Sequence, residues 1–443
     1  MIAGLHDWAA AMSNQNPAPE DSGAREAAAM ARYQAGDMAG AAVAFRELLA
    51  SQPKHANALQ FLAFEAGQRG DFAAAAEYYA RAAAVEPEDP VTRFNLAMAH
   101  MGLQQWPQAL TALDETLERE PRMIEAMLYR GSALERMQRP DDAALAYLRA
   151  TRFAEANLDP RRMPPELKQF LNHALGAVRA YLDREIDGAL AELTACHGAE
   201  SVARIRKGAD IFTGKRPREF AHPKWRPGLF YVPDLPPQAF YERGDFAWTE
   251  RVEAATDMVR AEMLNVLSDG RGFAPYVNHP EGSHAAEVWK GINQSHDWST
   301  FHFFRHGERI EENCARCPGT AALLDSLDLM RVPGYGPEVM FSVLKPHSRI
   351  PPHYGTVNGR LIVHLPLVVP PDCGALKAAG EARAWQEGRL MMFDDSFEHE
   401  AWNDSDQTRV VLIFDTWNPH LSEIEREAFR RVLGTAQRFE RAA

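Results

Sequence analysis

Hydrophobic and small residues in the first third of the chain recur with a period of 34 residues. One register holds alanine, in the series Ala41, Ala75, Ala109 and Ala143. Four positions after each alanine comes a large side chain, in the series Phe45, Tyr79, Leu113 and Tyr147. Because residues four apart lie on the same face of a helix, the pattern predicts a helix with a buried face in every unit.

Three further registers of the repeat predict the positions of the turns, of the ends of the units and of the close contacts between helices. The turn positions are Gly36, Gly70, Gln104 and Gln138. Prolines, which cannot continue a helix, end the units at Pro53, Pro87 and Pro121. Small residues recur where helices must approach closely, at Ala29, Ala63, Ala97 and Gly131. The pattern resembles the tetratricopeptide repeat, which implies an α-solenoid over residues 20–155.

The resemblance also implies a concave surface on the solenoid. We expect this groove to dock a peptide or protein substrate. The alternative, that the array only dimerises the chain or supports the next domain, stays open because a fold does not dictate its use.

The pattern changes twice after the array. A proline-rich break and helical periodicity predict a helical cap and linker over 156–221. A helix is expected over 246–267. Short β-rich runs separated by Pro, Gly and Asp then predict a closed or doubled antiparallel sheet, at 339–344, 360–369, 389–393 and 409–417.

Composition narrows the classes of function. The formal net charge of −13 disfavours a nucleic-acid binder, because phosphate contacts need clustered Lys and Arg. No apolar run approaches the roughly 20 residues that span a bilayer. The first residues, which include His6 and Asp7, lack the pattern of a secretory signal. Four cysteines in 443 residues fit a reducing compartment, so we expect a cytoplasmic protein.

Two histidines stand beside β-runs of the second half. His353 lies in Pro-Pro-His-Tyr-Gly and His399 in Phe-Glu-His-Glu-Ala-Trp. Two histidines at strand edges are compatible with two metal ligands on a barrel rim. The pair alone is a weak signal, since the chain contains 16 histidines.

The sequence around these histidines is more specific. The segments Val339-Met-Phe-Ser-Val-Leu, Arg360-Leu-Ile-Val-His-Leu and Phe393-Asp-Asp-Ser-Phe-Glu-His resemble the aspartyl/asparaginyl β-hydroxylase family of iron(II)/2-oxoglutarate oxygenases. The resemblance implies an oxygenase domain over 222–430, with a double-stranded β-helix (jelly-roll) fold. The expected fold class is therefore multidomain α + β, an α-solenoid followed by a jelly roll with flanking helices.

The same resemblance implies that His353 and His399 bind Fe(II). In the wider superfamily an acid two residues after the first histidine completes the site, but Gly355 stands there. This matches the family's two-histidine variant, in which water fills the position. Direct ligation by a nearby acid is the alternative, with candidates Asp394, Asp395, Glu398 and Glu400.

Binding of 2-oxoglutarate is assigned by resemblance to Arg409, helped by Ser342. Arginine suits a carboxylate because its planar fork can hold both oxygens. Alternate residues of a strand share a face, so Arg360, Ile362 and His364 are expected to line one pocket. His364 matches a position near the cosubstrate and Arg360 one near the acid of the substrate. Ile362 replaces an arginine common in the family, which puts an aspartate substrate in doubt.

The implied reaction consumes 2-oxoglutarate and O2, releases succinate and CO2, and hydroxylates an unactivated C–H bond. We expect the target to be the β-carbon of Asp or Asn in a peptide or protein recruited by the repeats. One alternative is hydroxylation of a free amino acid, a small metabolite or an acyl chain. The other is a repeat scaffold with a vestigial oxygenase domain, which the set of His353, His399, Arg409 and Ser342 argues against.

Overall fold

A computed structural model describes residues 20–442 of the chain. It divides into two units between Tyr181 and Leu182, inside helix α10. The residues on which the absence of a secretory signal was predicted lie outside the described range. In the described range, no helix is both long and apolar enough to cross a membrane.

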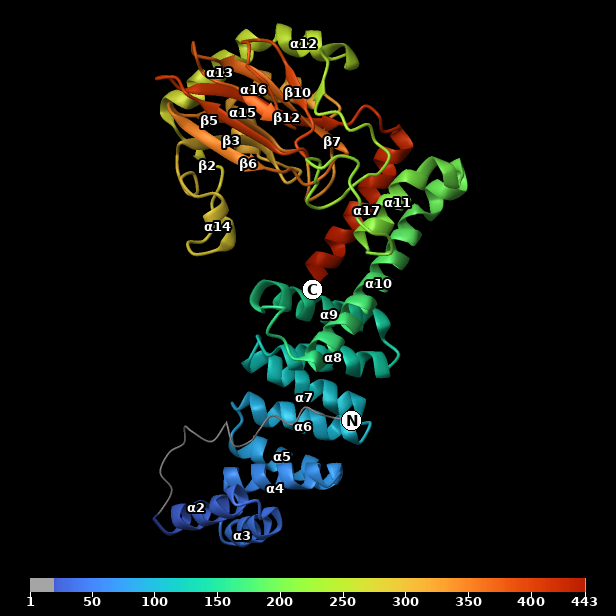
Figure 1. Cartoon of the computed structure of the whole chain (residues 1–443), viewed down its shortest axis with the longest axis vertical. Helices are drawn as coiled ribbons and strands as arrows, with labels where there is room; N and C mark the ends of the chain where they lie inside the picture. Colours follow the sequence, from blue (N-terminus) through green and yellow to red (C-terminus); the bar gives the residue numbers. More distant parts are fainter. Residues whose placement is uncertain (1–19, 443) are drawn as a thin grey trace. The chain divides into compact units, whose positions relative to one another are not determined.

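The first unit is an array of helix pairs, which Figure 1 shows stacked from α2 to α9. The helices are α2 (Glu20–Gln34), α3 (Met38–Ser51), α4 (Ala56–Gln68), α5 (Phe72–Val85), α6 (Pro90–Gly102), α7 (Trp106–Arg119), α8 (Ile124–Arg136) and α9 (Pro140–Asn157). The first half of α10 (Pro165–His197) packs on the last pair, where Phe170 contacts the edge of Tyr129 at 5.3 Å between ring centroids. The predicted α-solenoid is confirmed.

Each register of the repeat has a structural role in this unit. The four turn positions have φ of 83°, 79°, 57° and 59°, the left-handed region that glycine adopts without strain. The four alanines of the first register are buried, as are the large residues that follow them. At Gly131 a Cβ would lie 2.3 Å from the Tyr147 ring, so only glycine permits that approach.

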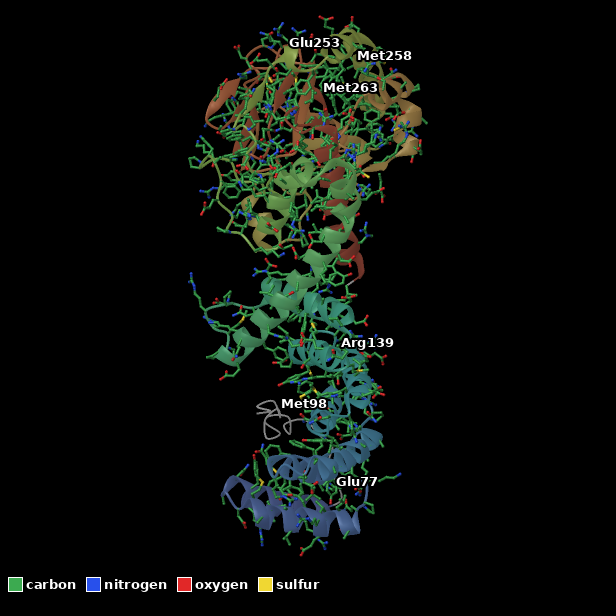
Figure 2. All side chains as sticks on the ribbon, turned by 90° about the vertical axis from the view of Figure 1, so that its right-hand side faces the viewer. Glu77, Met98, Arg139, Glu253, Met258 and Met263 are labelled. Atoms are coloured by element: carbon green, nitrogen blue, oxygen red, sulfur yellow. The ribbon has the colours of Figure 1, made fainter. Side chains whose placement is uncertain are left out.

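Side chains of the array are buried on one face of each helix and exposed on the other, as in amphipathic helices. Met98 is 1% exposed, whereas Glu77 and Arg139 are on the surface (Figure 2). Asp37 and Asp71 begin helices α3 and α5 by accepting hydrogen bonds from the N–H groups of Gly40 and Ala74. Local sequence therefore sets the ends of the helices, and alanine and aromatic packing joins them.

The second unit contains two antiparallel sheets and their flanking helices. The larger sheet has the order β1-β10-β7-β12-β5-β3-β2 with β4 paired to β3, and the smaller has the order β6-β11-β8-β9. The strands of the larger sheet are β1 (Phe240–Tyr241), β2 (Ala274–Pro275), β3 (Trp298–Arg305), β4 (Glu308–Arg309), β5 (Val339–Leu344), β7 (Arg360–Val368), β10 (Met391–Phe393) and β12 (Arg409–Trp417). Those of the smaller are β6 (Ser348–His353), β8 (Leu376–Ala378), β9 (Glu381–Arg383) and β11 (His399–Asn403).

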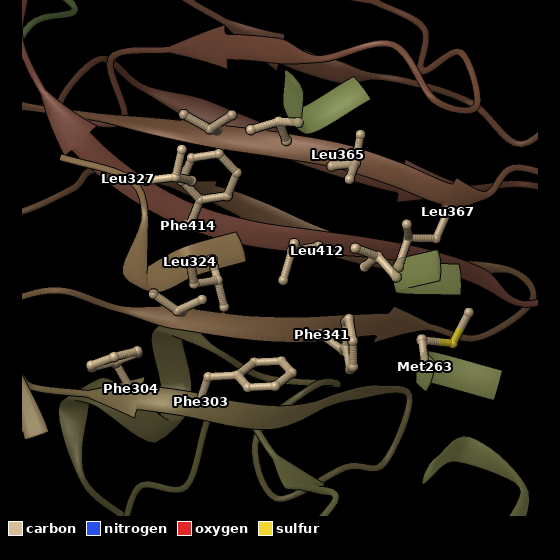
Figure 3. Close-up of a cluster of buried hydrophobic side chains, with 14 of the residues drawn as sticks. Met263, Phe303, Phe304, Leu324, Leu327, Phe341, Leu365, Leu367, Leu412 and Phe414 are labelled. Carbon is tan, nitrogen blue, oxygen red and sulfur yellow. The ribbon is translucent and has the colours of Figure 1, made fainter. Parts of the chain in front are cut away.

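Helices cover one face of the larger sheet. They are α12 (Thr249–Ala254), α13 (Thr256–Asp269), α15 (Glu311–Arg316) and α16 (Pro318–Asp325), with α14 (His284–Val288) in a separate segment. Figure 3 shows the core beneath them, in which Met263 and Leu324 of the helices meet Phe341, Leu365 and Leu412 of the sheet. The prediction of one helix over 246–267 was wrong, because the helix is interrupted at Ala255 between α12 and α13.

Alternate residues of the same strands form the opposite face. Ile362 and Val411 there pack against Ile350, Leu376 and Ala401 of the smaller sheet. A third cluster joins the second half of α10, helix α11 (Ala203–Phe212) and helix α17 (Glu423–Ala442) to the proline-rich segment before β1. The expected antiparallel β domain with flanking helices is confirmed, and the three-part domain division remains a prediction.

Candidate active site

The space between the two sheets holds a cavity of about 250 Å³. Strands β5, β7, β10 and β12 line it from one side, and β6, β8 and β11 from the other. Every residue predicted for the site lies in its wall, namely Ser342, His353, Arg360, His364, His399 and Arg409.

His353 and His399 are direct cross-strand partners of β6 and β11. Their ring centroids are 4.0 Å apart. The Nδ1 atom of His353 lies 2.8 Å from the carbonyl oxygen of Pro351, and that of His399 lies 2.9 Å from the carbonyl of Phe397. A carbonyl only accepts, so both Nδ1 atoms carry the proton and each Nε2 keeps its basic lone pair.

The electrostatics of the pair favour the neutral rings that metal binding requires. Burial, with repulsion from His399, lowers the pKa of His353 to about 3. Burial also lowers the pKa of His399. A second hydrogen bond that fixes the tautomer is typical of metal-binding histidines, so the pair fits a divalent metal such as iron(II).

Gly355 is the place where a third protein ligand would be expected. A Cβ there would lie 2.3 Å from the Asp395 carboxylate, which fills this space. The Gly355 N–H donates to the backbone oxygen of Asp395 at 2.6 Å. Among the described residues no group of three or more His, Cys, Asp or Glu side chains could hold a metal. Of the four candidate acids, Asp395 alone lines the cavity.

Arg409, the first residue of β12, is a buried cation in the wall of the same cavity. Its side chain is 1% exposed, and its Nε and Nη1 atoms have no hydrogen-bond partner. The guanidinium carbon lies 4.7 Å from the centroid of the Trp385 ring. Burial lowers the pKa of Arg409 to about 10. A buried charge without a counter-ion is costly, so this end of the cavity is suited to an anion.

Two neighbours complete the surroundings of Arg409. Ser342 accepts a hydrogen bond from the Trp298 indole at 3.1 Å, which leaves its own hydroxyl proton available to an acceptor. The Trp385 indole donates to Nδ1 of His364 at 3.1 Å. Burial, with repulsion from Arg409, lowers the pKa of His364 far below its usual value. His364 is therefore a neutral ring in this wall.

Arg360 differs from Arg409 because carboxylates already surround it. Its Nη2 lies 2.9 Å from Oδ2 of Asp395, and its Nη1 lies 3.6 Å from Oδ2 of Asp415. Burial raises the pKa of Asp415 to about 7, although Arg360 opposes the shift. Burial also raises the pKa of Glu338, which lines the cavity nearby.

Sequence reasoning missed Glu338 and Asp415 and left Asp395 as one of four candidates. Strand alternation could have found the first two. Glu338 is two residues before Met340 on the face of Ser342, and Asp415 is six residues after Arg409 on the face of that arginine. The proximity of Asp395 to Gly355 comes from the packing of separate segments and has no local signal.

Comparison with known proteins gives two family models that match parts of the chain. Residues 253–419 match the family model described as Aspartyl/Asparaginyl beta-hydroxylase, and residues 94–157 match a tetratricopeptide repeat model. A solved structure of MamA from Desulfovibrio magneticus RS-1 covers 35% of this chain and 84% of that chain, at 18% identity and a TM-score of 0.30.

Three curated relatives illustrate the range of the similarity. The mouse Aspartyl/asparaginyl beta-hydroxylase is 32% identical over 207 residues, which are 46% of this chain and 26% of the relative. The human Aspartate beta-hydroxylase domain-containing protein 2 is 33% identical over 46% of this chain and 53% of the relative. The Rhizobium tropici Ornithine lipid ester-linked acyl 2-hydroxylase is 34% identical over 40% of this chain and 60% of the relative. The chain thus matches between about a quarter and three fifths of these relatives. The stretch 253–419 thus matches the aspartyl/asparaginyl β-hydroxylase family model, and a match to a tetratricopeptide repeat model precedes it.

Proposed function

We propose that this chain is an iron(II)/2-oxoglutarate-dependent hydroxylase. The observation that carries the proposal is one cavity containing both a facing histidine pair and a buried arginine whose Nε and Nη1 atoms have no hydrogen-bond partner among the described residues. The first is suited to a metal and the second to a carboxylate. The match to the family model and to its relatives supports a hydroxylase of some kind.

Each of these residues would have a separate role in binding. His353 and His399 would hold iron(II) through Nε2, and the bound iron would supply the activation of dioxygen. Arg409 would hold the distal carboxylate of 2-oxoglutarate, with the Ser342 hydroxyl donating to it. Trp385 restricts Arg409 from one side and fixes His364 through its hydrogen bond. The buried side chains of the walls would limit the access of bulk water to the reacting groups.

The substrate proposed first is an Asp or Asn side chain of a peptide or protein docked by the repeats, with hydroxylation at the β-carbon. Peptide capture is a use to which helical repeat surfaces are suited. Small molecules and acyl chains form a second candidate class. The apolar Ile362 in the cavity wall favours this class, and one relative is named an acyl 2-hydroxylase.

A turnover experiment distinguishes the two classes of substrate. The full chain, supplied with iron(II), 2-oxoglutarate and O2, is incubated with Asp- or Asn-containing peptides or with free amino acids and fatty acyl amides. Succinate and incorporation of oxygen into the organic product are followed. Peptide-dependent succinate supports docking by the repeats, and turnover with small molecules but never with peptides contradicts it. Absence of succinate under all conditions, with or without a substrate, contradicts the hydroxylase proposal itself.

A further inference from the structure

The larger sheet presents opposite charges at the two ends of the cavity. Arg409 and Asp415 lie on one face of β12, and six residues of strand separate them by roughly 20 Å. On β5, Ser342 pairs with Val411 near the Arg409 end. Glu338 lies at the other end, where its N–H donates to Oδ2 of Asp415 at 3.0 Å. The proposed 2-oxoglutarate site is therefore cationic, and the far end is acidic.

Carboxylates outnumber cations at the acidic end. Arg360 is shared between Asp395 and Asp415. The Oδ1 atoms of both aspartates still have no hydrogen-bond partner, although the residues are only 6% and 0% exposed. A buried acceptor left without a hydrogen bond is costly. Asp395 lines the cavity, so a ligand bound there could donate the missing hydrogen bond to its Oδ1 atom. With Glu338, three acidic side chains of the described residues lie around the Arg360 guanidinium.

The other groups near Glu338 do not cancel this excess. Its carboxylate lies 3.0 Å from Nδ1 of His306 and 3.8 Å from Nδ1 of His302. Burial lowers the pKa of His302 to about 4, so this ring is neutral at neutral pH, and the His306 side chain is exposed to solvent. Arg305 also acts on Glu338, but it is exposed to solvent, where salt screens its field.

Between the two ends the cavity wall is apolar. Met340 and Ile413 are cross-strand partners, and Ile362 is the partner of Asp415 on the neighbouring strand. All three side chains line the cavity. A short run of methylenes can lie against them while a polar head reaches Glu338.

We propose that the substrate of this site carries a cationic head, a primary ammonium or a guanidinium on an alkyl stem, and that Glu338 selects it. This inference rests on the proposed hydroxylase function and adds the class of substrate. An anionic head would meet three carboxylates and a guanidinium that is already paired. A neutral head would leave the free oxygens of the acidic end unsatisfied.

Direct binding tests the inference without turnover. The full chain without added metal is titrated calorimetrically with three matched probes, the N-acetyl amides of lysine, norleucine and glutamate. The lysine probe is expected to bind roughly tenfold or more tightly than the norleucine probe, as a charge-assisted hydrogen bond predicts. The glutamate probe is expected to bind more weakly than either.

Two variants test whether Glu338 causes the preference for the lysine probe. Glu338→Gln keeps the shape of the side chain and should lower lysine-probe affinity about tenfold, while norleucine-probe affinity stays within about twofold. General damage to the cavity would weaken both probes. Glu250→Gln, at an exposed position of α12, removes the same charge from the chain and should preserve the lysine preference.

Equal affinities for the lysine and norleucine probes would overturn the inference, as would a preference for glutamate or failure of the lysine probe to bind. These titrations need neither iron nor 2-oxoglutarate, so they are independent of the hydroxylase proposal. A chain that prefers lysine but forms no succinate would keep the cation site and lose the proposed reaction.

Discussion

At the scale of single residues, two buried arginines of one cavity have different roles because of their partners. Arg360 is neutralised by Asp395 and Asp415, whereas Arg409 has a tryptophan face and unpaired N–H groups. Both are arginines flanking β-runs in the sequence, so their difference could not be predicted from local pattern. It depends on which acids the fold brings to each.

Removal of the Arg409 guanidinium should weaken the binding of 2-oxoglutarate. We expect Arg409→Ala to weaken 2-oxoglutarate binding by about 2–3 kcal/mol, the value of a charge-assisted pair, while iron(II) binding is retained. Equilibrium dialysis of both ligands under anaerobic conditions measures this. Arg349→Ala, at a largely exposed arginine of β6, is the control. Loss of iron together with 2-oxoglutarate would show that the role is misassigned.

The buried histidines contribute to the pH dependence of stability in the metal-free chain. The pKa of His353 is lowered to about 3, and those of His364 and His399 are lowered too, by burial first in each case. An unfolded histidine titrates near 6.5, so below that pH the unfolded chain binds more protons. The stabilisation by neutral rings is complete above pH 6.5 and is lost as the pH falls toward 3. The slope is at most about 1.4 kcal/mol per pH unit for each histidine.

Urea unfolding at several pH values between 7 and 5 measures this slope. His353→Asn should flatten it, because the variant has one fewer ring to protonate on unfolding. A His353→Asn variant with the parent slope would contradict the assignment of a buried neutral ring.

At the scale of elements, the sequence predicted those segments whose period is regular. The helix pairs follow from the 34-residue registers, and β5, β7, β10 and β12 follow from apolar runs. Strand β6 was missed because Pro351 and Pro352 lie within it, and proline is expected only at sheet edges. It is indeed an edge strand of the smaller sheet. Strands β8 and β9 have three residues each, too few to show a period.

The last repeat offers a direct test of the packing rule. Gly131→Ala would place a Cβ 2.3 Å from the Tyr147 ring. We expect it to lower the free energy of unfolding by about 1–3 kcal/mol, as overpacking does. Gly176→Ala is the matched control, since no atom lies within 4 Å of its added Cβ. It should stabilise helix α10 by about 1 kcal/mol through helix propensity. Equal effects of the two substitutions in thermal or urea unfolding would contradict this account.

At the scale of the whole molecule, net charge said little about the site. A formal charge of −13 disfavours nucleic acid, yet the cavity has a cationic and an acidic end. Six candidate residues could be predicted through family resemblance, and the fold brings all six to one cavity. Strand alternation indicates the faces of Glu338 and Asp415, but their meeting with Asp395 could not be predicted, because the three side chains come from separate segments. The cytoplasmic location remains a prediction.

The central claim is that the histidine pair and Arg409 form one iron(II)/2-oxoglutarate site. Anaerobic titration of 2-oxoglutarate into the full chain, with and without iron(II), tests it most directly. We predict that iron strengthens 2-oxoglutarate binding about tenfold or more, as coupled ligands do. In a chain with both His353→Ala and His399→Ala, this dependence on iron should vanish while weak binding at Arg409 remains. Equal affinity for 2-oxoglutarate with and without iron in the unsubstituted chain would contradict the account.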